Sequence, residues 1–176
     1  MWGFARHDIV PDIVTMGKPM GNGIPVSGMA ARPEVLEPFA TGIPYFNTFG
    51  GNPVAIAAAQ AVLDVLRDEG LPERAAVVGD QLRAAIRSVG DSRIGDVRGA
   101  GQFTGVEIVA DPASKTPDGA TALALVNALR EHRVLTSTAG PNNNVLKVRP
   151  PLSFQEHDID RFTDALAAAL ADVPAR

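Results

Sequence analysis

One apolar segment, residues 53–69, constrains the fold of this chain more than any other feature. Asn52 can cap a helix and Pro53 is favoured at the first helical position, so the pattern predicts a helix that runs to about Gly70. The segment is apolar on nearly all sides until Asp64. A helix of that kind is normally buried, so other parts of the protein must cover it.

The residues that precede this helix offer little that could cover it. Residues 1–53 predict a short strand at 13–16 and a second at 25–30, joined by loops rich in glycine and proline. Two short strands are not enough to enclose an apolar helix. We therefore expect residues 1–70 to belong to a larger domain or to be completed by another chain.

Residues 72–176 have a different sequence pattern, because segments with the apolar spacing of helices alternate there with short strand-like segments. This order predicts antiparallel strands covered by helices, an α+β domain. The expected elements are a helix from Pro72, strands at 96–100 and 103–109, a helix at 120–131, strands at 134–137 and 145–148, and a final helix after a capping box of Ser153 and Glu156.

Charge and residue types argue against several classes of function. The net charge is −4, with 16 Lys and Arg against 20 Asp and Glu, whereas nucleic-acid binding needs a basic surface. There is no Cys and the three His are far apart, so we expect neither a disulfide framework nor a metal site. The longest apolar run, residues 165–171, is too short to span a bilayer, and the first eight residues contain no secretory apolar region. We expect a cytoplasmic protein that does not bind a membrane.

The lysines stand out because arginine outnumbers lysine thirteen to three. Lys115 lies in a polar loop and Lys147 on a predicted strand, whereas Lys18 directly follows a strand in a glycine-rich loop. A lysine amine can form a Schiff base once it is activated, which an arginine guanidinium cannot. Glycines would also let the backbone approach a flat cofactor closely. Lys18 is therefore a candidate catalytic residue, and the alternative is a lysine beside an ordinary turn.

A second candidate site is the segment NTFGGNP, residues 47–53. The Thr48 hydroxyl and clustered backbone N–H groups next to a helix N-terminus suit a phosphate oxygen. The alternative is an ordinary glycine-rich start of a helix, with Asn52 as its cap.

Two basic segments in the second half suggest anion binding. Alternation along the predicted strand places Lys147 and Arg149 on one face, where they could hold a substrate carboxylate or phosphate. An exposed strand face explains the same pattern. Arg98, in DVRGAG, could lie near an anion, but its setting is more typical of a strand–turn–strand corner.

Four segments of the chain carry a resemblance to a known family, and they are PDIVTMGKPMGNGIPVSG, YFNTFGGNPVAIAAAQAVLDVL, GDVRGAGQFTGVEIV and NVLKVRPPLSF. Together they resemble the class III aminotransferases, pyridoxal-phosphate enzymes of fold type I. The resemblance covers essentially the whole chain, in order, and in detail it is strongest to the branch of ethanolamine-phosphate phospho-lyases and alanine–glyoxylate aminotransferases.

The resemblance implies a fold, a cofactor and roles for particular residues. It implies an α/β chain in which residues 1–70 end the large cofactor-binding domain and residues 72–176 form the small α+β domain. Lys18 would bind pyridoxal 5′-phosphate as an aldimine, a Schiff base, and would later move the Cα proton of the substrate as general acid and base. Thr48 would contact the cofactor phosphate across the interface of a homodimer.

The same resemblance bounds what this chain is expected to do. The family's ring-stacking aromatic, phosphate loop and acidic partner of the pyridine nitrogen would precede Met1, so we expect a C-terminal portion with an incomplete site. The leading interpretation is transfer of an amino group between an amine or amino acid and a keto acid. The alternatives are a phospho-lyase acting on an amino-alcohol phosphate and an inactive fragment serving as a dimerisation module. Lys147 stands where many members carry a carboxylate-clamping arginine, which favours a phosphorylated or otherwise unusual amine.

Overall fold

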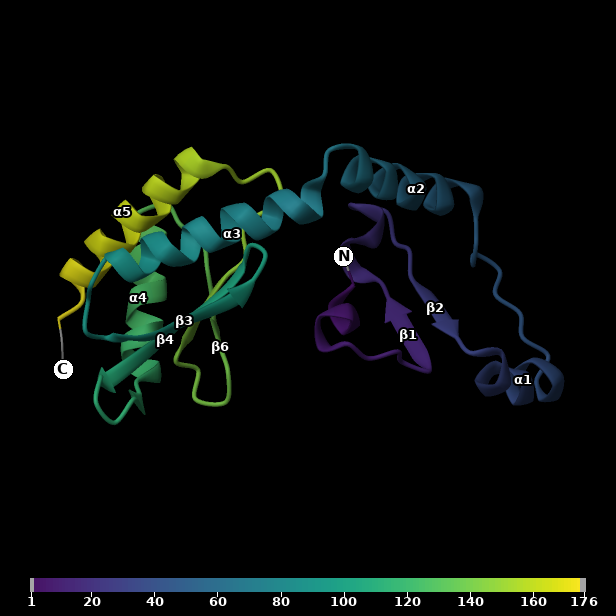
Figure 1. Ribbon diagram of the computed structural model, residues 1–176, viewed down its shortest axis with the longest axis horizontal. Helices are drawn as coiled ribbons and strands as arrows, with labels where there is room; N and C mark the ends of the chain where they lie inside the picture. The colour runs from purple at the N-terminus through teal and green to yellow at the C-terminus, as the bar shows by residue number, and fades with distance from the viewer. Residues whose placement is uncertain (1, 175–176) are drawn as a thin grey trace. The chain divides into compact units, whose positions relative to one another are not determined.

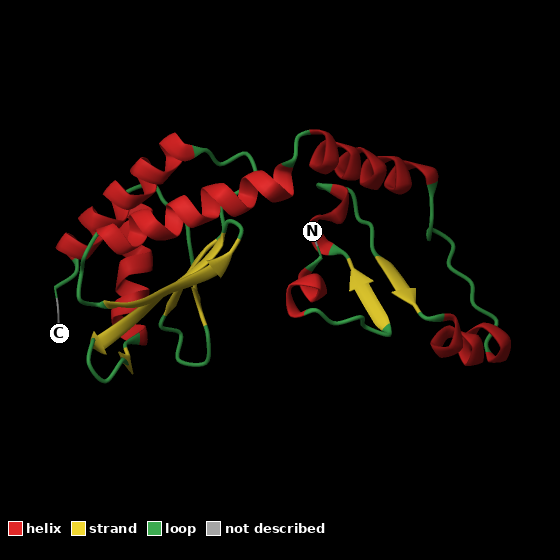
Figure 2. Ribbon diagram, viewed as in Figure 1, coloured by secondary structure: helices red, strands yellow, loops and turns green. Residues whose placement is uncertain are grey.

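The computed structural model describes residues 2–174 and divides the chain into two compact units, with the boundary between Leu71 and Pro72. Figure 2 shows that both units mix helices and strands. Each unit is described by itself below.

The first unit pairs two short antiparallel strands, β1 (Ile13–Met16) and β2 (Gly28–Ala31), with Met16 opposite Gly28. Its other elements are two 3-10 helices, η1 (Gly3–His7) and η2 (Lys18–Gly21), and two α-helices, α1 (Pro33–Gly42) and α2 (Pro53–Asp68) (Figure 1). Helix α2 packs against η2, so it supports the segment that contains Lys18.

Helix α2 begins as predicted but is not enclosed within its unit. The Asn52 side chain accepts a hydrogen bond from the Ala55 N–H at 3.0 Å, and Pro53 occupies the first turn. Ala55 is buried, whereas Val54 is 70% exposed and Ile56 is 51% exposed. The preceding residues thus leave much of this apolar helix open, as the sequence predicted.

The sequence predicted loops where the structure has α1. Pro33 lies in its first turn, where a missing N–H costs little, but Pro38 lies inside the helix, where proline normally breaks it. The proline content therefore misled the prediction. The second strand is also shifted, to Gly28–Ala31 rather than 25–30.

The second unit is an antiparallel sheet with helices on one face (Figure 1). Its strands pair in the order β3 (Ile94–Ala100), β4 (Phe103–Asp111), β7 (Val145–Val148) and β6 (Thr138–Ala139), and the short β5 (Thr116–Pro117) pairs with β4. The helices are α3 (Leu71–Ser88), α4 (Gly119–Glu131) and α5 (Glu156–Asp172). The predicted α+β architecture is confirmed.

The core of this unit lies between the sheet and its helices. Val106 and Leu146 from the strands join Leu82, Leu125 and Leu166 from the helices, and all five are fully buried. Because side chains alternate along a strand, the intervening strand residues lie on the other face of the sheet. That outer face is where Lys147, one of the two candidate substrate residues, lies.

Helix α3 is in close contact with the turn between β3 and β4. A Cβ on Gly79 would lie only 1.8 Å from the Gly101 carbonyl oxygen, so the turn can approach only because residue 79 has no side chain. Arg83 is buried, and its side chain donates to the same carbonyl at 2.7 Å and pairs with Asp80 at 2.6 Å. These contacts fix the hairpin against the helix.

Two details of the second unit correct the sequence predictions. The final helix is preceded by Gln155, whose N–H donates to the Asp158 carboxylate at 2.9 Å, so the capping box of Ser153 and Glu156 is wrong by two residues. The strand expected at 134–137 lies at Thr138–Ala139 instead, because the Val134 N–H donates back to the end of α4.

Candidate functional site

Lys18 lies where β1 ends and η2 begins. Its side chain is exposed, and no carboxylate in residues 2–174 forms an ion pair with it. Its backbone has a φ of 57°, a left-handed conformation that costs a residue with a side chain roughly 1–2 kcal/mol. The residue before a proline is further restricted toward extended backbone, and Pro19 follows directly. Lys18 is thus an accessible amine on a strained backbone.

The turn that carries Lys18 is tightly supported from behind. Gly21 is buried, and a Cβ on it would lie 2.7 Å from the Val26 Cγ1 atom. The Asn22 N–H closes the turn on the Pro19 carbonyl at 2.9 Å. This support holds the lysine backbone in its unfavourable conformation.

We expect Lys18→Gly to raise the stability of the chain relative to Lys18→Ala by roughly 0.5–1 kcal/mol. Glycine adopts a positive φ without strain, whereas alanine keeps the Cβ and hence the strain, and glycine's extra freedom in the unfolded state offsets part of the gain. Thermal unfolding of both variants at one protein concentration measures the difference. Equal melting temperatures would show that the backbone at Lys18 is not strained.

Asn47 organises the loop that contains Thr48. Its side-chain oxygen accepts from the N–H groups of Phe49 at 3.3 Å and of Gly50 at 2.9 Å. A Cβ on Gly50 would lie 2.6 Å from the Asn47 amide nitrogen, so this close turn depends on that glycine. Sequence reasoning missed Asn47, although an asparagine shortly before two glycines is a signal for such a turn.

Two of the backbone donors that the sequence suggested for a phosphate are used within this loop. The N–H groups of Phe49 and Gly50 are occupied by Asn47, so they are not available to a phosphate. The Thr48 hydroxyl is exposed and has no hydrogen-bond partner among residues 2–174.

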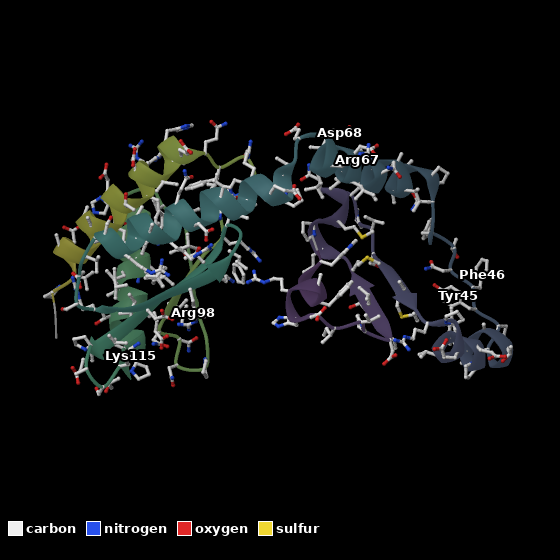
Figure 3. The ribbon with its side chains drawn as sticks, in the orientation of Figure 1. Tyr45, Phe46, Arg67, Asp68, Arg98 and Lys115 are labelled. Carbon is white, nitrogen blue, oxygen red and sulfur yellow. The ribbon has the colours of Figure 1, made fainter. Side chains whose placement is uncertain are left out.

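The structure does not bring Lys18 and Thr48 together. In Figure 1, residues 43–52 run from α1 to the first turn of α2, away from the paired strands and η2. Figure 3 labels Tyr45 and Phe46 of this loop, and the Tyr45 ring lies 5.7 Å from the ring of Phe39 on α1, between centroids.

Lys147 and Arg149 occupy different settings in the second unit. Lys147 is half-buried on β7, and its backbone is fixed by two hydrogen bonds of 2.8 Å, from its N–H to Ser137 and to its carbonyl from Thr136. It lines a groove of about 220 Å³. Arg149 is exposed beyond the end of β7 and does not line this groove.

Arg98 is held by two carboxylates on the outer face of the sheet, where Figure 3 labels it. It forms ion pairs with Asp96 at 2.8 Å and with Glu107 at 2.5 Å. The hydrogen bond from Arg98 lowers the pKa of Asp96, and the hydrogen bonds to Asp96 and then Glu107 raise the pKa of Arg98. The positive charge of Arg98 is thus balanced by these two carboxylates of the sheet. Arg98 also lines the groove.

Across residues 2–174, no cluster of three or more His, Cys, Asp or Glu side chains is arranged to hold a metal ion. In the same residues, no helix has the length and apolar character needed to cross a membrane.

Comparison with known proteins gives consistent matches. The family model for class III aminotransferases matches residues 1–170. The chain is 46% identical to an alanine–glyoxylate aminotransferase 2-like protein of Drosophila melanogaster, over 92% of this chain and 33% of that protein. It is 42% identical to the mitochondrial alanine–glyoxylate aminotransferase 2 homolog 2 of Arabidopsis thaliana, over 94% of this chain and 35% of that protein.

Among solved structures, a phospholyase from Arthrobacter in complex with phosphoethanolamine superposes with a TM-score of 0.93 at 39% identity. The match covers 99% of this chain and 42% of that one. The chain therefore spans about a third of the length of the curated relatives and less than half of the solved relative.

Proposed function

Because the chain belongs to the class III aminotransferases, a family that depends on pyridoxal 5′-phosphate, we propose that it is the C-terminal part of such an enzyme. In this proposal the enzyme transfers an amino group between an amine or amino acid and a keto acid. Residues 1–70 form the end of the large cofactor-binding domain, and residues 72–176 form the small domain. The observation that carries the proposal is the accessible Lys18 amine on a strained, tightly supported turn.

The donors of the first unit fit the cofactor. Pyridoxal phosphate presents an aldehyde, which an unpaired primary amine can bind, and a phosphate, which a free hydroxyl can contact. Lys18 supplies such an amine and Thr48 such a hydroxyl. Lys18 lies in η2, whereas the loop of residues 43–52 that contains Thr48 runs away from the paired strands and η2 in Figure 1, and this supports a role for Thr48 in the site of a partner subunit.

Each candidate residue then has a definite task. Bound pyridoxal phosphate supplies an electron sink for the substrate's Cα electron pair. Lys18 holds the cofactor and, once its amine is free, removes and returns the Cα proton. Thr48 donates a hydrogen bond to a phosphate oxygen, and Lys147 and Arg149 attract the anionic end of the substrate.

A second candidate function is phosphate elimination from an amino-alcohol phosphate. Lys147 favours it, because a lysine does not offer the planar fork that suits a carboxylate. The similarity to the Arthrobacter phospholyase supports the same alternative. Product analysis separates the two, since elimination releases phosphate and ammonia whereas transamination consumes a keto acid.

The assembly and compartment are proposed as well. A homodimer would cover α2 and bring Thr48 to a second site. A cytoplasmic location is proposed for the enzyme, whereas the similar protein of Arabidopsis is named as mitochondrial, and cell fractionation distinguishes the two compartments.

We expect borohydride reduction of the chain with pyridoxal phosphate to label Lys18 and neither Lys115 nor Lys147. Reduction fixes the cofactor on the lysine that binds it, and peptide mapping by mass spectrometry locates the added mass. Lys18→Ala is the control and should remove the label. A label on Lys115 or Lys147 in place of Lys18 would overturn the assignment.

A further inference from the structure

A second cavity of the second unit lies between the end of α3 and β3, the strand at one edge of the sheet. Its volume is about 370 Å³, and it shares no lining residue with the groove at Lys147. Three of the side chains that line it are charged, and they are Arg87, Asp91 and Asp96. The cavity thus combines one cation and two carboxylates that the proposed function does not use.

The backbone on both sides of the cavity departs from regular structure. The pairing of β3 with β4 shifts between Ile94 and Asp96, so Gly95 is the extra residue of a β-bulge. A Cβ on Gly95 would lie 2.6 Å from the Val109 Cγ1 atom, so the bulge depends on the glycine. On the other side, the chain leaves α3 through Gly90, whose φ is 72°. Two glycines therefore shape the walls that carry the charged side chains.

Both carboxylates of the cavity are fixed by arginines that do not line it. Asp91 pairs with Arg93 at 2.7 Å, and Asp96 pairs with Arg98 at 2.8 Å. These side-chain hydrogen bonds lower the pKa of Asp91 and of Asp96, so both carboxylates stay charged at neutral pH. Asp91 already accepts three hydrogen bonds from Arg93, and its side chain is 22% exposed, whereas that of Asp96 is 42% exposed. Asp96 is therefore the more available acceptor.

Arg87 is the charged group of the cavity without an ionic partner. Its guanidinium donates a hydrogen bond to the Val97 carbonyl, which anchors it against β3. It forms no ion pair with any residue among 2–174. A guanidinium has five N–H donors in one plane, so Arg87 keeps donors free for an anion.

We propose that this cavity is a binding site for a free α-amino acid, whose carboxylate pairs with Arg87 and whose ammonium group pairs with Asp96. The planar fork of an arginine matches a carboxylate in two parallel hydrogen bonds. A ligand with a negative charge alone would be repelled by the two carboxylates, and a ligand with a positive charge alone would be repelled by Arg87. A small zwitterion carries both charges and satisfies both ends.

The amino acid held here is a ligand and not a substrate. No lysine lines the cavity, so nothing in its lining can bind an aldehyde cofactor as a Schiff base. The inference goes beyond the proposed function and does not depend on it, because none of the three charged residues belongs to the proposed active site.

Equilibrium dialysis of the full chain with radiolabelled glycine, at constant ionic strength and without pyridoxal phosphate, tests the site. We expect saturable binding that Arg87→Met and Asp96→Asn each weaken by roughly tenfold or more, since each removes a hydrogen bond between charged groups. Arg161→Met is the matched control, because it removes an exposed arginine from α5 outside the cavity. Lys147→Met is the second control, and both controls should leave the affinity unchanged.

Unlabelled competitors test the zwitterion on the unmodified chain. Alanine should displace the label, whereas acetate and methylammonium at the same concentration should not. The inference is wrong if glycine shows no saturable binding, if acetate displaces it as well as alanine does, or if Arg87→Met binds it unchanged. A loss in Lys147→Met equal to that in Arg87→Met would assign the binding to the groove instead. If circular dichroism shows that Asp96→Asn does not fold, Arg87→Lys replaces it, and its affinity should lie between those of the unmodified chain and Arg87→Met.

Discussion

The purified 176-residue chain is expected to self-associate or to precipitate. Large apolar side chains of the first unit are exposed to solvent: Phe46 is 84% exposed, Phe49 80%, Val54 70% and Tyr45 69%. Figure 3 labels two of them, Tyr45 and Phe46. At about 25 cal/mol per Å², several hundred Å² of such surface represents on the order of 10 kcal/mol. That is comparable to the whole stability of a domain, so the surface should find a partner.

Light scattering of the purified chain over a range of concentrations measures this association. The double variant Phe46→Ser, Phe49→Ser should shift the sample toward smaller species. Leu135→Ser, which removes an equally exposed side chain from the second unit, should not. A compact, soluble monomer of the unmodified chain with one cooperative unfolding transition would contradict the proposal that residues 1–70 are part of a larger domain.

Gly79→Ala is expected to destabilise the second unit by about 3 kcal/mol, the upper end for overpacking. Alanine is the better helix former by roughly 1 kcal/mol, so helix propensity alone predicts the opposite sign. The added Cβ would meet the Gly101 carbonyl oxygen at 1.8 Å, and the turn cannot retreat without breaking its bond from Arg83.

Denaturant unfolding followed by far-ultraviolet circular dichroism tests this sign. Ala84→Gly, at an exposed position of the same helix, is the control and should cost only about 1 kcal/mol. If Gly79→Ala were as stable as the unmodified chain, the contact between α3 and the hairpin would have to be looser than described.

The second unit could be predicted in outline because periodicity reports directly on burial. The helical stripe of α3 and the alternation along β4 both marked residues that are buried in the structure. The predicted strand positions were wrong where a local backbone hydrogen bond determines which residues join the sheet. Val134 has the apolar character of a strand residue, but its N–H is used to end α4.

The candidate site could be predicted only one residue at a time. Residue type singled out Lys18, Thr48 and Lys147, because each offers chemistry that its neighbours lack. The groove could not be foreseen, since it depends on the register that places Gly105 between Arg98 and Lys147. Alternation within a strand assigns a face, but it does not specify which residues of distant strands lie opposite one another.

The division into two units has a practical consequence for spectroscopy. The chain has one tryptophan, Trp2, and one tyrosine, Tyr45, and both belong to the first unit. Intrinsic fluorescence excited at long wavelength therefore reports on that unit alone, and the second unit, whose aromatic rings are phenylalanines, is silent. A fluorescence melt would miss its unfolding entirely, and a tryptophan placed at Phe162 in its core would supply the missing signal.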